Sequence, residues 1–224
     1  LSKANTSFAE ALVATLEKSD QYTAGHSKAV AIYTRDIARR MGLAHNVQVR
    51  AYLCGLVHDI GKVGLPASVL LKDGPLTLEE RRQMQEHSAI GDSILSKVEL
   101  YADVAKIVRH HHERIDGEGY PDGLAGNEIP LMSRIIAVAD AYNAMTSNRS
   151  YRKAMPSRVA RLRLAQAVES QFDTAAVAAF EAILASAHED YRTAQRADFE
   201  PHDGISAESI RDDEPIGVPV AGAA

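Results

Sequence analysis

The chain has 224 residues, 46% of them hydrophobic, so it can bury a substantial core and is not disordered throughout. Its formal net charge of −5 argues against a surface that coats nucleic acid. The single cysteine, Cys54, excludes an internal disulfide and fits a reducing compartment, so we expect a cytoplasmic location.

No apolar run approaches the roughly 20 residues that cross a bilayer, and we expect no signal peptide. We therefore expect neither DNA nor a membrane as a partner of this segment. The first residue is leucine rather than methionine. We expect the full-length protein to carry an upstream regulatory region, which is also where a membrane anchor would lie.

The hydrophobic pattern is helical almost throughout, and no run alternates with the period of two that is typical of a strand. Ser7 and Glu10 form a capping box that predicts a helix start there. A second helix is predicted over 29–41, with Gly42 at its end. A third is predicted from about residue 47 into the "HDIGK" motif at 58–62.

A second capping box, Thr77 with Glu80, predicts one helix that runs to about Val98. A short apolar stretch over 104–108 leads into three consecutive histidines. Pro130 suits the start of the next helix, "LMSRIIAVADAYNAM".

An alanine-rich segment over 156–187 predicts one or two further helices. The segments 64–75 and 116–130 are rich in glycine and proline and are predicted to be loops. The pattern therefore predicts an all-α domain over 1–187, followed by a disordered tail over 188–224.

Several polar residues continue the apolar stripes of separate predicted helices, where burial is costly unless they are paired. A single inward histidine is more often a hydrogen-bonded core residue than a metal ligand. The whole set is nevertheless too large for one ion, and two cations bridged by a carboxylate would satisfy it. The set comprises His26, His58, Asp59, His87, His111, His112 and Asp140.

Imidazole and carboxylate ligands without a thiolate suit iron or manganese, and also zinc or nickel. Paired metals promote in-line phosphoryl displacement. Lys62 lies one turn beyond His58, where its ammonium would bind a phosphate oxygen. His110 is expected to lie outside the ligand set, and Cys54 is expected to be core packing.

The ordered motifs "HDIGK", "GLP", "GPLTLEE", "HHERIDGEGYPDGLAGNEIP", "RIIAVADAY" and "NRSYR" resemble those of the HD-GYP domain family of metal-dependent phosphohydrolases. The resemblance runs from about residue 20 to residue 180. It implies an all-α, HD-type helical bundle with a dinuclear metal centre in its core. It also implies hydrolysis of cyclic di-GMP to pGpG, or on to GMP, by a metal-bridging hydroxide.

The resemblance also implies roles for individual residues. One metal would be held by His26, His58, Asp59 and Asp140, and the second by His87, His111 and His112, with Asp59 bridging. Lys62 and Asp59 would be catalytic. The substrate would be bound by Gly119, Tyr120, Pro121, Arg149 and Arg152.

Two residues depart from the family pattern. Tyr22 occupies the position where some members have a glutamate that supports a third metal, so two metals are expected. Asn143 stands where family members commonly have an aspartate. The contact that this position makes behind the metal ligands, or its part in recognising the base, is therefore in question.

Two other functions are compatible with the sequence. One is an HD phosphohydrolase acting on another nucleotide, although the complete Gly119-Tyr120-Pro121 motif favours a cyclic dinucleotide. The other is a module that binds the dinucleotide, or a signalling protein such as a diguanylate cyclase, with little or no turnover. A homodimer is also compatible with the sequence.

Overall fold

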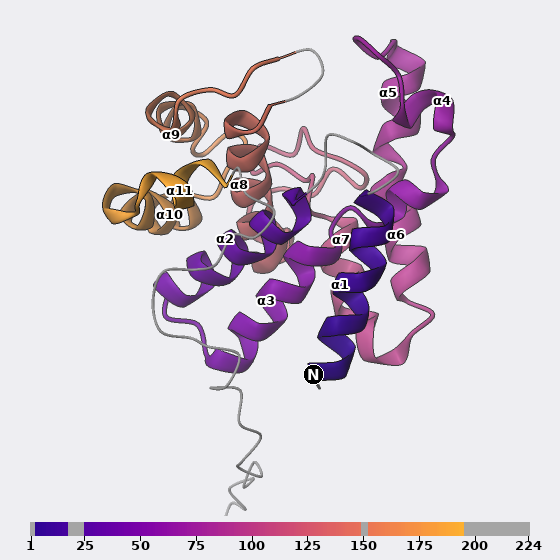
Figure 1. The fold of residues 1–224 in the computed structure, drawn as a ribbon, viewed down its shortest axis with the longest axis horizontal. Coiled ribbons are helices and arrows are strands. Elements are labelled where there is room, and N and C mark those ends of the chain that lie inside the picture. Colours follow the sequence, from indigo (N-terminus) through magenta and orange to yellow (C-terminus); the bar gives the residue numbers. More distant parts are fainter. Residues whose placement is uncertain (1–2, 18–24, 149–151, 195–224) are drawn as a thin grey trace, which may run out of the picture.

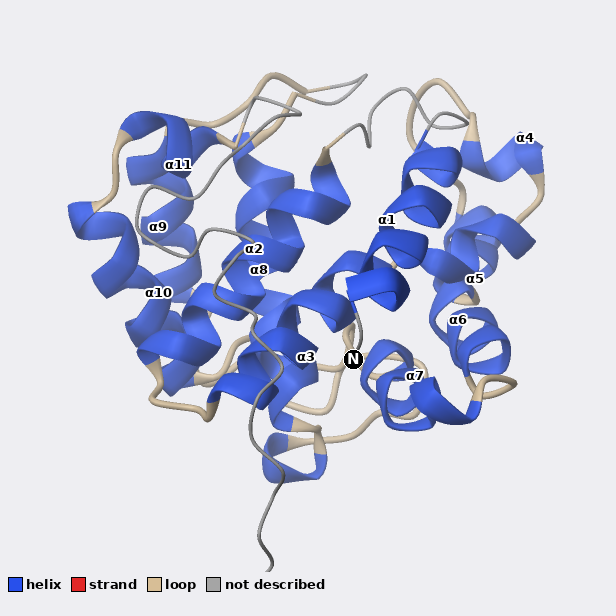
Figure 2. Cartoon of the chain, turned by 60° about the horizontal axis from the view of Figure 1, so that its bottom comes forward, coloured by secondary structure: helices blue, strands red, loops and turns tan. Residues whose placement is uncertain are grey.

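The computed structural model describes residues 3–17, 25–148 and 152–194, and in these ranges every regular element is a helix (Figures 1 and 2). This confirms the all-α fold predicted from the hydrophobic periodicity. The α-helices are α1 (Lys3–Glu17), α2 (His26–Arg40), α3 (His45–Val57), α4 (Ala67–Leu70), α5 (Leu78–Gln85), α6 (His87–Leu95), α7 (Ala102–Arg109), α8 (Leu131–Thr146), α9 (Ser157–Gln166), α10 (Thr174–Ser186) and α11 (Glu189–Thr193). The short 3₁₀ helices are η1 (Ile60–Gly64), η2 (Glu99–Tyr101) and η3 (Gly126–Glu128).

Helices α2 and α3 pack against each other at the centre, and α2 also contacts α8 and α10. Gly55 permits the close approach of α3 to α2, because a β-carbon there would lie 2.8 Å from the Ala31 Cα. Gly42, at φ 76°, follows α2 in the left-handed conformation that favours glycine, as the sequence predicted.

Two glycines allow η1, α6 and α7 to pack closely together, on the side of α3 away from α2. A β-carbon on Gly61 would lie 1.9 Å from the His87 carbonyl oxygen, so only glycine fits where η1 crosses α6. A β-carbon on Gly91 would lie 2.9 Å from Val108 Cγ1, so glycine likewise permits the close approach of α6 to α7. These contacts set the "HDIGK" segment directly against His87.

The predicted helix starts have mixed outcomes. Thr77 and Glu80 form the predicted capping box at the start of α5. The box predicted at Ser7 and Glu10 is wrong, because α1 already begins at Lys3. The single helix predicted from residue 78 to about Val98 is also wrong: α5 ends at Gln85, and α6 begins at His87.

Helix α11 lies beyond residue 187, where the disordered tail was predicted to begin, so residues 188–194 belong to the folded part. Its Tyr191 ring contacts the ring of Tyr33, which is fully buried. The Tyr33 hydroxyl donates to the Tyr191 carbonyl (2.6 Å), and the Tyr191 hydroxyl donates to Asp36 (2.9 Å). The sequence pattern missed α11 because a helix this short shows no periodicity.

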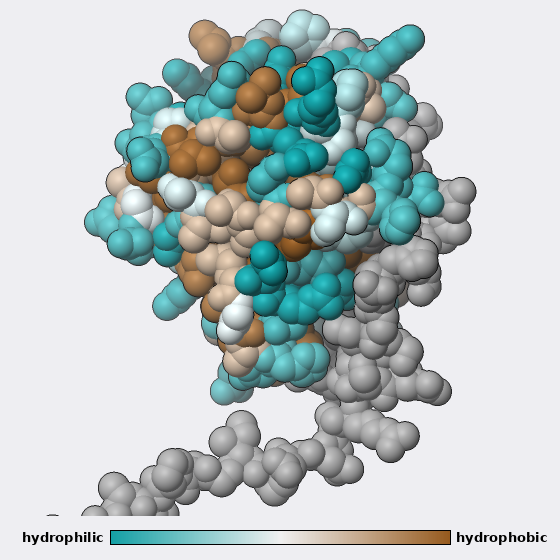
Figure 3. Space-filling view, turned by 90° about the vertical axis from the view of Figure 1, so that its left-hand side faces the viewer, coloured by the Kyte–Doolittle hydropathy of each residue, from teal (hydrophilic) through white to brown (hydrophobic). Residues whose placement is uncertain are grey.

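Helices α9, α10 and α11 form one side of the molecule, where hydrophobic and hydrophilic residues are interspersed (Figure 3). The large apolar side chain most exposed on α9 is Leu162. None of the helices within the described ranges has the length and apolar character needed to span a membrane.

Candidate metal centre

Three histidines from different parts of the chain are oriented in the same way. In His58, His87 and His111, Nδ1 lies 2.8, 2.6 and 2.5 Å from the carbonyl oxygen of the residue three positions earlier. A carbonyl can only accept a hydrogen bond, so Nδ1 carries the proton in each ring. Each Nε2 is therefore left with a free lone pair.

These lone pairs converge in the interior. His87 Nε2 and His111 Nε2 lie 3.3 Å apart, and His58 Nε2 is buried without a hydrogen-bond partner in the described chain. Three buried acceptors without a donor are unfavourable unless a cation lies among them. Neutral imidazole nitrogens are also common ligands of divalent transition metals, so the residues present fit such ions.

The Asp59 carboxylate lies between the histidines. Its Oδ1 is 3.4 Å from His87 Nε2, and its Oδ2 is 3.4 Å from His58 Nε2 and 3.8 Å from His26 Nε2. Burial opposes ionisation of Asp59, but the Lys62 ammonium, 2.6 Å away, holds the pKa of this carboxyl well below its usual range. The carboxylate therefore offers one oxygen to each side of the cluster.

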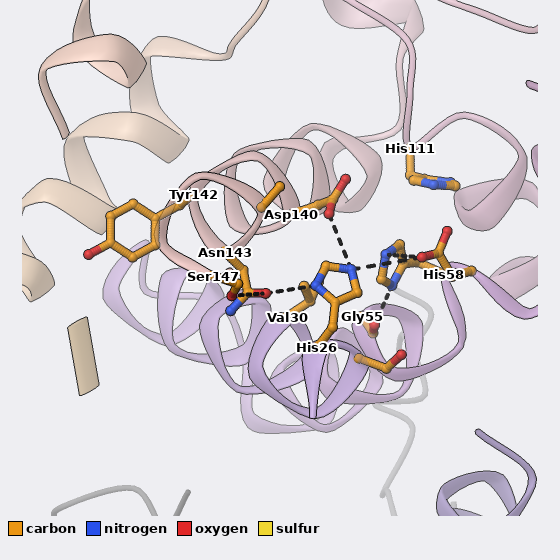
Figure 4. A network of polar contacts seen from close by, with 12 residues as sticks. His26, Val30, Gly55, His58, His111, Asp140, Tyr142, Asn143 and Ser147 are labelled. Carbon is orange, nitrogen blue, oxygen red and sulfur yellow. Dashed lines mark hydrogen bonds and ion pairs between the residues drawn. The ribbon is translucent and has the colours of Figure 1, made fainter. Parts of the chain in front are cut away.

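His26 and Asp140 close the cluster from α2 and α8 (Figure 4). His26 Nε2 lies 3.4 Å from Asp140 Oδ1. On the other side of the ring, His26 Nδ1 is 2.7 Å from the amide oxygen of Asn143. The backbone on both sides of His26 is held from α1, because Glu17 accepts hydrogen bonds from the amides of Gly25 (2.9 Å) and Ser27 (3.0 Å).

The potential ligand atoms fall into three overlapping groups within the described residues. In each group the atoms lie within 4.8 Å of one another. The groups are His26, His58 and Asp140; His87, His111 and His112; and His58, Asp59 and His111. The structure brings all seven predicted ligand residues together, and the third group links the other two through His58 and His111.

Burial keeps four of the clustered histidines, His26, His87, His111 and His112, neutral. It lowers the pKa of His111, helped by the nearby His58 and His87, to about 3. Burial likewise lowers the pKa of His26, His87 and His112 below the usual 6.5. A neutral imidazole is the form that binds a metal, so the site does not have to release protons from these rings near neutral pH.

The three consecutive histidines divide between the cluster and the loop that follows. His111 and His112 face the cluster, whereas His110 Nε2 lies 2.9 Å from Asp122 Oδ2. Arg109 binds the same carboxylate through two nitrogens, each at 2.7 Å. His110 thus helps to hold the glycine-rich loop and lies outside the ligand set, as predicted.

The buried Glu113 holds that loop from the inside. Its carboxylate accepts hydrogen bonds from the backbone amides of Asp122 (2.7 Å), Gly123 (3.1 Å) and Leu124 (3.1 Å). Sequence reasoning did not single out Glu113. Its position directly after the two ligand histidines and before a run of glycines was the available signal.

Two residues of the predicted substrate loop lie against the histidines. The Tyr120 ring packs on His112, with ring centroids 4.8 Å apart, and its edge faces His87 at 6.5 Å. A β-carbon on Gly119 would lie 2.4 Å from the Arg114 amide nitrogen, so glycine is required for this approach. Pro121 is exposed at the surface of the loop.

The remaining predicted residues have different outcomes. The guanidinium of Arg152 donates to the carbonyl oxygen of Ala144, on α8, and is partly exposed. Arg149 and Tyr22 lie outside the described residues. Cys54 is fully buried in the core, as predicted, and burial raises the pKa of its thiol to about 12.

The site and the fold define an HD-type protein, and comparison with known families agrees. The chain belongs to the family described as "HD domain", whose model matches residues 10–176. Its Gly119-Tyr120-Pro121 loop is of the HD-GYP type.

The chain is also similar to several curated proteins. It is 42% identical over 141 residues to 3'3'-cGAMP-specific phosphodiesterase 3 of Vibrio cholerae, covering 63% of this chain and 31% of that protein. It is 41% identical over 152 residues to a cyclic di-GMP phosphodiesterase of Pseudomonas aeruginosa, covering 67% of this chain and 37% of that protein. The chain thus spans about a third of the length of these relatives.

Two solved structures share the fold. A cyclic GMP-AMP-specific phosphodiesterase of V. cholerae has a TM-score of 0.55 and 32% identity, over 85% of this chain and 44% of that one. An HD-GYP-type protein of Bdellovibrio bacteriovorus has a TM-score of 0.59 over 72% of this chain and 52% of that one, at 18% identity. The second likeness concerns the fold alone.

Proposed function

We propose that the chain is a metal-dependent phosphodiesterase that hydrolyses a cyclic dinucleotide. One observation carries this proposal: buried, unprotonated imidazole nitrogens converge on the two oxygens of Asp59. The names of the relatives support the substrate class, since they are cyclic di-GMP and 3'3'-cGAMP phosphodiesterases.

Two divalent cations, iron or manganese, would divide these ligands. His26, His58 and Asp140 would hold the first and His87, His111 and His112 the second, and Asp59 would be shared between them. When bound, such a pair would supply Lewis-acid chemistry for an in-line phosphoryl displacement.

The chain's own residues orient the phosphodiester. Lys62 lies at the solvent side of Asp59, with 24% of its side chain exposed against 15% for the carboxylate. Its ammonium is placed to bind a non-bridging phosphate oxygen and to offset the charge that develops there. Tyr120 covers His112 and offers an aromatic face at the edge of the cluster, where a nucleobase can stack.

Cyclic di-GMP is the proposed substrate, with pGpG as the first product, and Arg149 and Arg152 are proposed to bind its phosphates. The curated cyclic di-GMP phosphodiesterases of P. aeruginosa and Thermotoga maritima, each 41% identical to the matched part of this chain, support this choice. Mixed GMP–AMP dinucleotides remain a second substrate to test, because some relatives carry that name.

The test is hydrolysis of cyclic di-GMP and of 3'3'-cGAMP by protein loaded with Fe²⁺ or Mn²⁺ under anaerobic conditions. Products are resolved by chromatography and bound metal by elemental analysis. Release of pGpG is the expected result. Binding of either dinucleotide by the metal-loaded protein without turnover would refute the proposed hydrolysis and favour a binding module.

Two variants test the roles. Asp59→Ala should lose metal and activity together. Lys62→Ala should keep both metals and lose about 10²–10³-fold in turnover, as when a group that stabilises transition-state charge is removed. Lys106→Ala, on an exposed position of α7, is the matched control. Full activity in Asp59→Ala, or unchanged turnover in Lys62→Ala, would refute the corresponding role.

A further inference from the structure

His26 differs from the other histidines in the partner of its Nδ1. The Nδ1 atoms of His58, His87 and His111 are held by backbone carbonyls in their own segments, which no substitution of a side chain removes. The Nδ1 of His26 is held instead by the side chain of Asn143, from α8, at 2.7 Å. The orientation of His26 therefore depends on a contact between two helices (Figure 4).

The surroundings of Asn143 show what determines its orientation. The side chain is 1% exposed, and its Oδ1 also accepts a hydrogen bond from the Ser147 hydroxyl at 3.3 Å. Its Nδ2 is buried with no hydrogen-bond partner among the described residues. The amide thus leaves a buried donor unsatisfied while its oxygen faces His26, an arrangement that has a cost.

An amide at this position behaves differently from a carboxylate. A carboxylate only accepts, so it would keep the proton on His26 Nδ1 and make Nε2 a more basic ligand. An amide can also turn over and present its NH₂ group to Nδ1. That orientation satisfies Nδ2 and moves the ring proton to Nε2, which then points at Asp140 Oδ1, 3.4 Å away, and cannot bind a cation.

We propose that Asn143 is a positioning residue that controls the tautomer of His26, and that it makes the cation position at His26 and Asp140 the weaker of the two. The cation there competes with the turned amide, whereas the Nδ1 atoms of His87 and His111 lie against backbone carbonyls, which cannot donate a hydrogen bond. The inference rests on the proposed two-cation centre.

Metal titration and the ring tautomer test this inference in the 224-residue chain. Mn²⁺ is titrated into metal-free protein, and the free ion is followed by electron paramagnetic resonance. The His26 tautomer is read from long-range ¹H–¹⁵N correlations in the metal-free state. Asn143→Asp, which keeps the shape of the side chain, and Asn143→Ala are compared with the wild-type protein. Asn46→Asp, the same change at an exposed position, is the control.

In the wild-type protein we expect two Mn²⁺ sites of unequal affinity. Asn143→Asp should tighten the weaker site by about 10-fold or more, and Asn143→Ala should weaken it by about 10–100-fold, the usual range for partners that orient metal ligands. The Asp variant should hold the metal-free His26 ring wholly in the Nδ1-protonated tautomer. Asn46→Asp should change neither quantity.

The outcomes separate this inference from the proposed function. Binding of a single Mn²⁺ by the wild-type protein would overturn the two-cation centre itself. Two sites whose affinities and His26 tautomer are the same in Asn143→Asp as in the wild-type protein would overturn the role of Asn143 alone. If Asn143→Ala fails to fold, the near-isosteric Asn143→Asp decides.

Discussion

Glu113 holds the loop over the metal centre, and its replacement tests how far the loop depends on one carboxylate. Glu113 is 3% exposed and accepts three backbone hydrogen bonds from residues 122–124. In Glu113→Gln, one oxygen can keep two of them, but the new NH₂ group faces the third amide. A hydrogen bond to a charged group contributes about 1.5–3 kcal/mol, and an unsatisfied buried donor costs about 1–3 kcal/mol.

We therefore expect Glu113→Gln to lower the free energy of unfolding by about 1–3 kcal/mol. Glu113→Ala loses all three hydrogen bonds. Asp122 and Gly123 are exposed, so their amides can bind water in this variant. We therefore expect the free energy of unfolding to fall by about 3 kcal/mol, which is less than the sum over three hydrogen bonds. In a domain of this size each kcal/mol corresponds to about 2–4 °C in Tm.

Urea and thermal unfolding of the metal-free variants measure this effect. Glu118→Gln is the matched control, because Glu118 lies in the same loop but is 80% exposed, with only a 3.9 Å ion pair to Arg114. Its stability should change by less than about 0.5 kcal/mol. If Glu113→Gln unfolds at the same urea concentration as Glu118→Gln, the three hydrogen bonds do not hold the loop as described.

Three further predictions concern other parts of the fold. The pKa of His111 falls from 6.5 to about 3 on folding, so only the unfolded chain gains a proton as the pH drops below 6.5. Below pH 6.5, His111 should therefore lower the stability of the metal-free protein by up to about 1.4 kcal/mol per pH unit. Equal stability in urea at pH 5 and pH 7.5 would contradict this prediction. The buried Cys54 thiol, with its pKa raised to about 12, should react with iodoacetamide only after unfolding; labelling of the native protein as fast as of the unfolded chain would show that the thiol is accessible. Glu17→Ala should lower the free energy of unfolding by about 1–2 kcal/mol and speed hydrogen exchange at the amides of Gly25 and Ser27, whereas unchanged exchange would contradict the two hydrogen bonds of Glu17.

The sequence was informative wherever an element is long and periodic. The apolar stripes of α2 and α8 are repeated every three or four residues, so their existence and buried faces followed from the pattern. The seven polar residues on such stripes could be selected because burying them without partners is costly. The ordered motifs then suggested how these residues divide between two cations.

Contacts between distant segments had no local signal in the sequence. Helix α11 is held by Tyr191 against Tyr33, far along the chain, and its own five residues carry no periodicity. The break between α5 and α6 was missed because the apolar pattern continues across it. Glu113 was missed because its three partners are backbone amides, which any residue other than proline supplies.

By itself, therefore, the amino-acid sequence determined the helical class and the set of candidate metal ligands, because both follow from residue type and spacing. Only the tertiary structure decided which nitrogen of each ring faces inward and that Asp59 lies between the two groups. It also decided that His26 relies on Asn143 and Glu17. Those features depend on how helices cross, and crossings such as that of α2 and α3 are set by close packing at particular residues, Gly55 among them.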